Sequence, residues 1–343
     1  MQQQTLLVTG GAGFIGSHFI AYFLSNYPSW RVLNLDKLTY AADLARLKEC
    51  EQNPRYRFVH GDICDAPLLA CLFEKYDVRG VIHFAAESHV DNSIASPKPF
   101  IQTNVEGTFA LLEAARAWWQ PEGRPRAGYE NCRFHHISTD EVYGSLGAEG
   151  FFTENSPYAP NSPYAASKAS SDLLVRAYYR TYGLNVTVSH CSNNYGPKQH
   201  AEKLIPTIIR CALEGRPIPI YGDGQNVRDW LYVQDHCAAV CLIWEKGRRG
   251  ETYNIGGHDE RNNVQVAREV CALLDELAPS PDGKPYKRLI SFVQDRPGHD
   301  RRYAIDSSKT EKELGWRAEE DFGTGLRKTV QWYLAQRGGL AVF

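Results

Sequence analysis

The stretch that decides the fold is TLLVTGGAGFIG, residues 5–16. Its first half contains a short apolar run, Leu6 to Thr9, of the kind that forms a buried strand, and a helical pattern, Ile15 to Leu24, follows at once. The glycines between them stand where a tight turn, a close backbone approach and helix–strand packing call for a residue without a Cβ. The stretch therefore predicts a strand–turn–helix unit that opens an α/β fold.

The same alternation continues over the first half of the chain. Predicted strands are Leu6 to Thr9, Val32 to Leu35, Arg57 to Val59, Gly80 to Phe84, Phe134 to Ser138 and Asn185 to His190. Predicted helices between them are Ile15 to Leu24, Pro67 to Glu74, Thr103 to Trp118 and Tyr164 to Tyr182. Such alternation indicates right-handed βαβ units and a doubly wound, Rossmann-like parallel sheet. Ligands of these sheets bind at the carboxyl ends of the strands.

Asp36 ends the second predicted strand, 20 residues after Gly16. A carboxylate in that position accepts hydrogen bonds from a ribose 2′-hydroxyl and repels a 2′-phosphate. The N–H groups freed by the glycine turn, together with the helix dipole, favour a pyrophosphate. The pattern thus predicts a dinucleotide site for NAD rather than NADP, although Lys37 leaves NADP open. Asp62-Ile63 and Phe84 to Ser88 follow two further strands and extend the same predicted site.

The regular alternation ends at about Cys191, after which Gly, Pro and polar residues become frequent. We expect residues 1–190 to form the dinucleotide-binding domain, completed by segments near 230–256 and 303–320. Residues 191–343 should form a smaller, less regular substrate lobe that is interleaved with it. No linker composition separates the two parts, and Gln120 to Gly128 has the Pro, Gly and Arg content of a surface loop.

Composition narrows the class of protein. The chain has 343 residues, of which 43% are hydrophobic and 23% charged, as in ordinary globular enzymes. The net charge of −2 gives no electrostatic reason to expect a nucleic-acid or membrane partner. Nine cysteines without a Cys-x-x-Cys pair predict neither a disulfide framework nor a metal site, and Cys237 and Cys241 should be core residues. A strand that starts at Thr5 leaves no room for a signal peptide, so we expect a cytoplasmic protein.

Tyr164 and Lys168 lie one helical turn apart, and no other tyrosine has a lysine four residues on. An ammonium beside a phenol stabilises the phenolate, so we expect a lowered Tyr164 pKa and a base for a sugar hydroxyl. Alone, the pair is about as consistent with a surface location. Its position on the helix after the Ser138 strand, in a chain with a dinucleotide pattern, favours the catalytic interpretation.

A second motif, Thr139 to Gly144 (TDEVYG), leaves the strand that ends at Ser138. Adjacent carboxylates such as Asp140 and Glu141 repel each other, so one tends to keep its proton near neutral pH. That split provides one acid and one base. Elsewhere the interpretation would be a solvated acidic strand end, but on this edge of the sheet, beside Tyr164, a catalytic role is favoured.

These motifs resemble the extended short-chain dehydrogenase/reductase superfamily and, within it, the dTDP-glucose 4,6-dehydratase family, over nearly the whole chain. The TDE triplet and Asp295 to His299 (DRPGH) are the specific segments. The other matching segments are Gly10 to Gly16, Asp36 to Tyr40, Ala85 to Asp91, Tyr164 to Lys168, Asn193 to Pro197, Lys203 to Pro206 and Arg228 to Trp230. The departures are Asn92 in place of arginine and Ala42-Asp43 in place of Gly-Asn.

The resemblance implies a hydro-lyase reaction. Tyr164, aided by Lys168, removes the C4 hydroxyl proton of the sugar while NAD takes the C4 hydride, and Thr139 hydrogen-bonds that oxygen. Glu141 then removes the C5 proton, and protonated Asp140 donates to the departing C6 hydroxyl. Hydride returns to C6 and Glu141 reprotonates C5, so NAD is not consumed. The product is the dTDP-4-keto-6-deoxy sugar of deoxysugar biosynthesis, and a homodimer is implied.

The resemblance also implies the binding residues. Cofactor contacts are expected at Gly10, Gly13, Phe14, Ile15, Gly16, Asp36, Lys37, Leu38, Thr39, Asp62, Ile63, Phe84, Ala85, Ala86, Ser88, Thr103, Tyr164, Lys168 and Asn194. Substrate contacts are expected at Ser88, Thr139, Asn193, Lys203, Leu204, Pro219, Tyr221, Arg228, Asn263, Asp295, Arg296 and His299. Arg228 and Arg296 suit a diphosphate, because a guanidinium can bind phosphate oxygens in pairs, and Tyr221 offers a face to the base.

Three alternatives remain. A UDP-hexose 4-epimerase shares the C4 oxidation but needs no C6 acid, and Asp140-Glu141 argues against it. A GDP-mannose dehydratase catalyses a closer reaction, but resemblance to that enzyme would favour NADP and a triplet that begins with Ser-Glu. Asp36 and Asp140 therefore argue against it. A catalytically inactive NAD-binding regulator should lack Tyr164, Lys168 or the carboxylates, and all of these are present.

Overall fold

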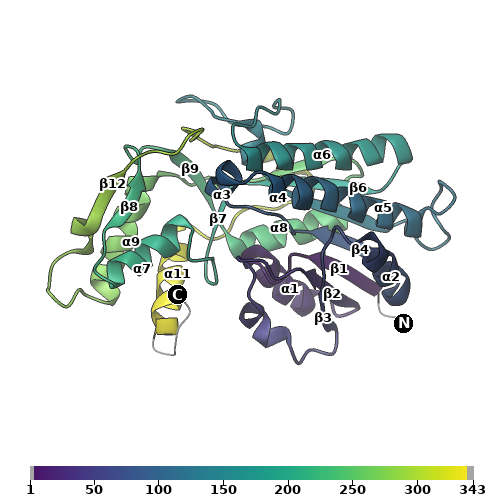
Figure 1. Cartoon of the computed structure of the whole chain (residues 1–343), viewed down its shortest axis with the longest axis horizontal. Coiled ribbons are helices and arrows are strands. Elements are labelled where there is room, and N and C mark those ends of the chain that lie inside the picture. The colour runs from purple at the N-terminus through teal and green to yellow at the C-terminus, as the bar shows by residue number, and fades with distance from the viewer. Residues whose placement is uncertain (1–3, 338–343) are drawn as a thin grey trace.

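A seven-stranded parallel sheet forms the centre of the computed structural model, which describes residues 4–337; residues 338–343, the end of the expected substrate lobe, lie outside the described residues, as do residues 1–3. The strand order is β10-β6-β5-β4-β1-β2-β3 (Figure 1). Their bounds are β1 Gln4–Thr9, β2 Trp30–Asp36, β3 Tyr56–His60, β4 Val78–His83, β5 Arg133–Thr139, β6 Val186–Cys191 and β10 Thr252–Ile255. The predicted doubly wound Rossmann-like fold is confirmed.

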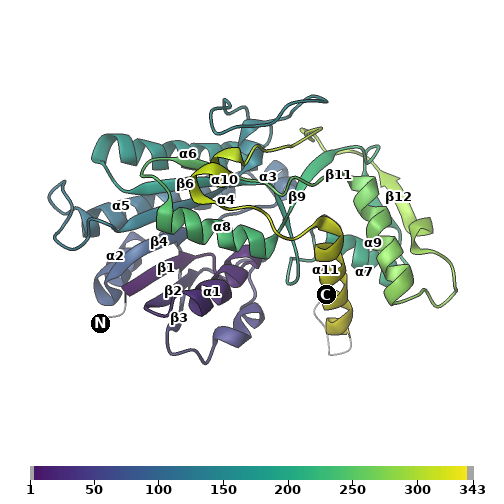
Figure 2. The same cartoon turned by 180° about the vertical axis from the view of Figure 1, so that it is seen from behind.

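Alternating apolar side chains explain why helices cover both faces of this sheet. Leu6 and Val8 of β1 belong to a core with α1 and α8, whereas Leu7 packs into a core with α2, α5 and α6. Figure 2 shows the face that carries α1 and α8. The helix bounds are α1 Phe14–Asn26, α2 Ala66–Tyr76, α5 Gly107–Trp119, α6 Pro163–Tyr182 and α8 Val233–Lys246.

Two boundaries differ from the sequence prediction in ways that affect the site. β5 runs one residue further than predicted, because Thr139 still pairs with Cys191 of β6. The helix expected from Thr103 begins instead as a π-helical stretch, Ile101–Glu106, and continues as α5 from Gly107. A π-helical stretch of this kind is often found at a functional site.

The second half of the chain adds a smaller lobe beside the sheet (Figure 1). Its strands are β7 Asn193–Tyr195, β8 Ile218–Tyr221, β9 Val227–Tyr232, β11 Glu260–Asn262 and β12 Ile290–Val293. Its helices α7 Leu204–Leu213, α9 Asn263–Leu277 and α11 Phe322–Arg337 share one apolar core with β8 and β9. The chain returns to the main sheet twice, through α8 and β10 and through α10, Ser308–Leu314, which packs on β10.

Other expectations concern the surface and the cysteines. Of the predicted surface loop Gln120 to Gly128, residues 121–128 are exposed, whereas Gln120 is buried. Cys237 and Cys241 are buried in the core that α8 shares with α1. Across residues 4–337 no helix has both the length and the apolar character that a bilayer crossing requires. Within that same range, no three His, Cys, Asp or Glu side chains converge as a metal site would need.

Candidate active site

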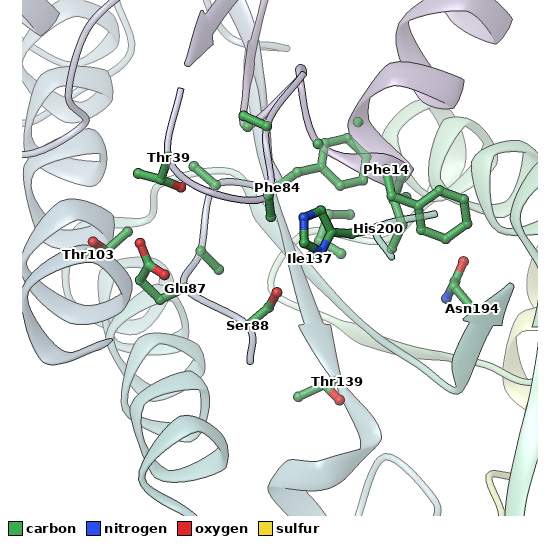
Figure 3. A pocket seen from close by; sticks show the side chains of 18 of the residues that line it. Phe14, Thr39, Phe84, Glu87, Ser88, Thr103, Ile137, Thr139, Asn194 and His200 are labelled. Atoms are coloured by element: carbon green, nitrogen blue, oxygen red, sulfur yellow. The ribbon is translucent and has the colours of Figure 1, made fainter. Parts of the chain in front are cut away.

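One cavity of about 330 Å³ lies where the carboxyl ends of the sheet strands meet the second lobe. All five residues predicted to be catalytic line it, namely Thr139, Asp140, Glu141, Tyr164 and Lys168. Figure 3 shows Thr139 at the end of its strand, with Ser88, Phe84 and Asn194 around the same space. Of the expected cofactor contacts, only Leu38 is outside the lining, and of the expected substrate contacts Ser88, Thr139, Asn193 and Lys203 are inside it.

The glycine turn at one end of the cavity leaves no room for side chains. Gly10 has a φ of +72°, and a Cβ on it would lie 2.6 Å from the backbone nitrogen of Ala85. A Cβ on Gly16 would lie 2.4 Å from the carbonyl oxygen of Gly10. No side chain caps the start of α1 at Gly13, so its first N–H groups are available to an anion. The turn therefore fits the pyrophosphate of a dinucleotide.

We expect Gly10→Ala to weaken NAD binding at least about tenfold and to lower the free energy of unfolding by about 3 kcal/mol, because backbone strain and a steric clash combine. Gly123→Ala is the matched control, since Gly123 has a φ of +74° but, among the residues that the structure describes, none apart from its two chain neighbours comes within 4 Å of its Cβ position. It should cost only about 1 kcal/mol. Calorimetry of NAD binding and thermal unfolding measure both effects, and equal losses in the two variants would contradict the clash.

Asp36 is held at the end of β2 by two backbone N–H groups, from Ala12 to Oδ2 (2.9 Å) and from Leu38 to Oδ1 (2.8 Å). Each carboxylate oxygen keeps a second lone pair for a ribose hydroxyl. Leu38 thus contributes its N–H to Asp36, while its side chain is 37% exposed. Lys37, which left NADP open, binds Asp62 at 2.6 Å. Its charge is therefore already paired, and the ribose end of the cavity fits NAD.

The two carboxyls of the TDE triplet have different surroundings. Asp140 is only 2% exposed, and burial, with the neighbouring Glu141 and Asp229 charges, raises its pKa well above the usual range. Burial also raises the pKa of Glu141, but Arg296, Arg228 and Lys203 oppose that rise. Asp140 Oδ1 accepts a hydrogen bond from the Thr139 hydroxyl at 3.3 Å. The arrangement gives Asp140 the character of an acid and Glu141 that of a base.

The raised pKa of Asp140 has a consequence for stability. A carboxyl whose pKa is raised by folding stabilises the native state at pH values below its unfolded pKa of about 3.9, and this contribution is lost as the pH rises through the folded value. We therefore expect Asp140→Asn, which cannot ionise, to be more stable than the parent at pH 7 by about 1 kcal/mol or more. Thermal unfolding across pH should show the two proteins converging below about pH 4; an equal stability at pH 7 would contradict the buried acid.

The predicted lowering of the Tyr164 pKa is wrong. Burial raises the pKa of Tyr164 well above its usual value, the Glu141 charge raises it further, and a hydrogen bond with Thr139 opposes the rise. The Lys168 Nζ donates to the carbonyl oxygen of Ile137 at 2.8 Å. Burial lowers the pKa of Lys168 to about 8. Tyr164 is thus a protonated phenol beside a cation that is itself close to titrating.

The remaining expected substrate residues lie outside the cavity lining, in the second lobe. Arg228 is buried on β9 against the ring of Tyr303, at 4.2 Å from its centroid. Arg296 lies 3.4 Å from Asp91 Oδ1, and the Tyr221 hydroxyl donates to Asp91 Oδ2 at 3.2 Å. Both arginines act electrostatically on Glu141. They are therefore close enough to Glu141 to act on its charge, although neither lines the cavity.

Five further expected substrate residues remain, namely Leu204, Pro219, Asn263, Asp295 and His299. His299 packs edge-on against Tyr221, with ring centroids 6.3 Å apart, and its Nδ1 lies 2.6 Å from Asp295 Oδ1. Asn263 begins α9 and donates its N–H to the Asn226 carbonyl, while Leu204 packs on the core of the second lobe. Pro219 is exposed on β8. Tyr221, His299, Asp295 and Arg296 thus form one group, whereas Leu204 and Asn263 have structural partners.

Sequence reasoning missed a segment that closes one side of the cavity. Gln199, His200 and Glu202 reach the lining from the connection between β7 and α7. Glu202 lies 3.6 Å from His89 and 3.6 Å from Lys203, so it joins segments from both lobes. The sequence feature that could have indicated these residues is the polar run between Gly196-Pro197 and α7. Also missed were Leu35, Ala41, Ala42, Gly61, Ile137, Ser138, Cys191 and Ser192.

Comparison with known proteins agrees with this geometry. The family model described as GDP-mannose 4,6 dehydratase matches residues 7–329. A dTDP-glucose 4,6-dehydratase of Neisseria meningitidis is 58% identical over 96% of this chain and 93% of the relative.

Two solved structures resemble the whole chain. The dTDP-glucose 4,6-dehydratase DesIV of Streptomyces venezuelae, with NAD bound, has a TM-score of 0.88 at 49% identity and covers 98% of each chain. The dTDP-glucose 4,6-dehydratase of Bacillus anthracis, in complex with NAD, has a TM-score of 0.86 at 46% identity and again covers 98% of each chain. With its TDE triplet and dinucleotide cavity, the chain belongs to the nucleotide-sugar 4,6-dehydratase family, in the dTDP-glucose branch.

Proposed function

We propose that this chain converts dTDP-glucose into dTDP-4-keto-6-deoxyglucose and one molecule of water, with NAD as a recycled cofactor. The observation that carries the proposal is the convergence of Tyr164, Asp140 and Glu141 on the cavity that the glycine turn opens. An epimerase would have no use for a buried acid beside a base, and the 58% identity to a dTDP-glucose 4,6-dehydratase agrees. The Asp36 carboxylate and the Lys37–Asp62 ion pair favour NAD over NADP.

Each catalytic residue has its own role in this reaction. When bound, NAD supplies the hydride acceptor for C4 and the hydride donor for C6. Tyr164 takes the C4 hydroxyl proton, and the Lys168 ammonium stabilises the phenolate once it forms. The ketone at C4 acidifies the C5 proton, which Glu141 removes. Asp140, which burial keeps protonated, gives its proton to the C6 hydroxyl as it leaves as water.

Substrate binding is proposed to use both lobes. Arg228 and Arg296 are suited to the diphosphate, and their positive charges also lower the pKa of Glu141 against the effect of its burial. Tyr221, 40% exposed beside His299, offers its ring to the base. The hexose then lies between Glu141 and the glycine turn, within reach of Thr139 and Tyr164.

The test is to incubate the holoenzyme with dTDP-glucose in D₂O and to analyse the product by mass spectrometry. We expect loss of one water, one deuterium at C5 delivered by Glu141, and no net NADH. UDP-glucose is the matched control, and its conversion to an isomer of unchanged mass would favour the epimerase alternative. Binding of NAD without turnover of either sugar would favour the regulator.

We further propose that two copies associate through α5 and α6, which pack side by side on one face of the sheet (Figure 1). Phe109 on α5 is 49% exposed and Leu173 on α6 is 55% exposed. Light scattering should give the mass of a dimer, and Leu173→Glu should shift it toward the monomer, whereas a parent protein of monomer mass would contradict the proposal. The cytoplasmic location stays a prediction.

A further inference from the structure

A buried polar cluster lies behind Lys168 and has no part in the chemistry described above. It contains His136 on β5, Asp172 on α6 and His190 on β6, all of them fully buried. The Lys168 Nζ lies 3.3 Å from His136 Nε2, which lies 3.3 Å from Asp172 Oδ1. Asp172 Oδ2 in turn lies 2.9 Å from His190 Nε2. An imidazole therefore stands on each side of this carboxylate.

Hydrogen-bond partners fix a proton on His190 Nδ1. The Asn254 amide donates through Nδ2 to the carbonyl oxygen of Phe152 (3.1 Å), which directs its Oδ1 to the Tyr143 hydroxyl (2.9 Å). The single Tyr143 proton is used in that bond. Its oxygen, 2.7 Å from His190 Nδ1, must then accept, so Nδ1 donates.

The other ring nitrogen of His190, Nε2, has two polar neighbours. It lies 2.9 Å from Asp172 Oδ2, which also accepts from the Ser138 hydroxyl at 2.8 Å, and 3.1 Å from the Tyr158 hydroxyl. Burial alone would raise the pKa of Asp172, but hydrogen bonds with His136 and His190 outweigh it and hold the pKa well below its usual range. Asp172 is thus a buried carboxylate held between two imidazole rings.

The second oxygen of this carboxylate faces Lys168. Asp172 Oδ1 lies 3.3 Å from His136 Nε2, and the Lys168 ammonium lies 3.3 Å from that same nitrogen. Charges interact strongly where water is excluded. We propose that Asp172 is a positioning residue whose buried negative charge keeps Lys168 charged behind Tyr164. Only the role of Lys168 in this statement rests on the proposed function.

The groups around Asp172 leave Lys168 as the one that titrates just above neutral pH. Burial lowers the pKa of His136 to about 4, so this ring stays neutral. Burial lowers the pKa of Lys168 to about 8, and the Asp172 charge opposes the lowering. Titratable or charged side chains that face the cluster from the surrounding elements are His83, His136, His190, Cys191, Tyr143, Tyr158, Lys168 and Arg176.

Neutron diffraction from the deuterium-exchanged holoenzyme near pH 7 tests the charge state directly and does not depend on turnover. We expect no deuterium on either carboxylate oxygen of Asp172. A deuterium on Asp172 would overturn the proposal. Because this measurement uses the unmodified protein, failure of the proposed function would leave it decisive.

The role toward Lys168 is tested by the pH dependence of kcat for dTDP-glucose. In Asp172→Asn the alkaline limb, where Lys168 loses its proton, should move about one unit lower, so kcat near pH 8 falls roughly fivefold. KM should stay within about twofold, because Asp172 touches no substrate. An unshifted alkaline limb in Asp172→Asn would overturn the proposal.

Two further variants separate charge from packing. Asp172→Glu keeps the carboxylate and should keep the alkaline limb of the parent; a shift as large as that of Asp172→Asn would mean that charge is not the cause and would overturn the proposal. Thr187→Val removes a buried hydrogen bond on the same strand as His190, between Thr187 Oγ1 and His135 Nδ1 (2.8 Å). It should lower thermal stability without moving either limb, and a shift here would likewise count against Asp172.

Discussion

Tyr164→Phe should lower kcat for dTDP-glucose by about 10³-fold while leaving KM and NAD content nearly unchanged. The phenol is the predicted acceptor of the C4 hydroxyl proton, and phenylalanine keeps the shape of the ring but cannot take a proton. The loss should be the same in kcat and in kcat/KM, because the missing interaction is made only as the proton moves. Steady-state kinetics and a single-turnover measurement of NADH absorbance provide the check, and no NADH should form in the variant.

Tyr182→Phe is the matched control for this loss. Tyr182 is on the same helix, α6, and is 45% exposed, so removal of its hydroxyl should leave kcat within about twofold of the parent. A decrease of less than tenfold in Tyr164→Phe would remove Tyr164 from its role as base. The raised pKa of Tyr164 makes it a weak proton acceptor at rest, because burial and the Glu141 charge favour the protonated phenol. The phenolate therefore has to form during the reaction, with the charge of Lys168 as its support.

Sequence pattern located the residues at strand ends well, for a simple physical reason. In a parallel sheet the carboxyl ends of all strands lie on one edge, so the residues that follow β1, β2, β4 and β5 must come together. The glycine turn, Asp36, Ala85 and Thr139 meet in one cavity on this account. Two expectations, the Rossmann-like sheet and the NAD cofactor, depended mainly on this rule and are confirmed.

Residues that depend on how the second lobe folds back were harder to predict. Gln199, His200 and Glu202 reach the cavity from a connection whose path no periodic pattern specifies. The prediction of a lowered Tyr164 pKa was wrong for a related reason. A spacing of four residues identifies Lys168, but it does not indicate which carboxyl groups the fold brings close to Tyr164. The partners of Asp172 likewise come from β5 and β6, which only the folded sheet brings to α6.

Glu141→Gln and Asp140→Asn should each lower kcat for dehydration by about 10²- to 10⁴-fold. The reaction should stop at a different step in each variant. Both variants keep Tyr164, so both should oxidise C4 and accumulate NADH. In Glu141→Gln no side chain can take the C5 proton, and sugar recovered from D₂O should carry no deuterium at C5. In Asp140→Asn the base remains and only the proton for the leaving hydroxyl is lost, so C5 should exchange while the hydroxyl stays on C6.

The contrast between these two variants shows which carboxyl group is the acid and which is the base, whereas loss of activity alone would not. Burial gives Asp140 the higher tendency to keep its proton, whereas Arg296, Arg228 and Lys203 favour the ionised form of Glu141. If the roles were reversed, C5 exchange would survive in Glu141→Gln and disappear in Asp140→Asn. Normal turnover in Glu141→Gln would remove Glu141 from the mechanism. Mass spectrometry of the recovered sugar, with NADH absorbance on the same samples, decides between these outcomes, because each carboxyl acts on a different carbon of the hexose.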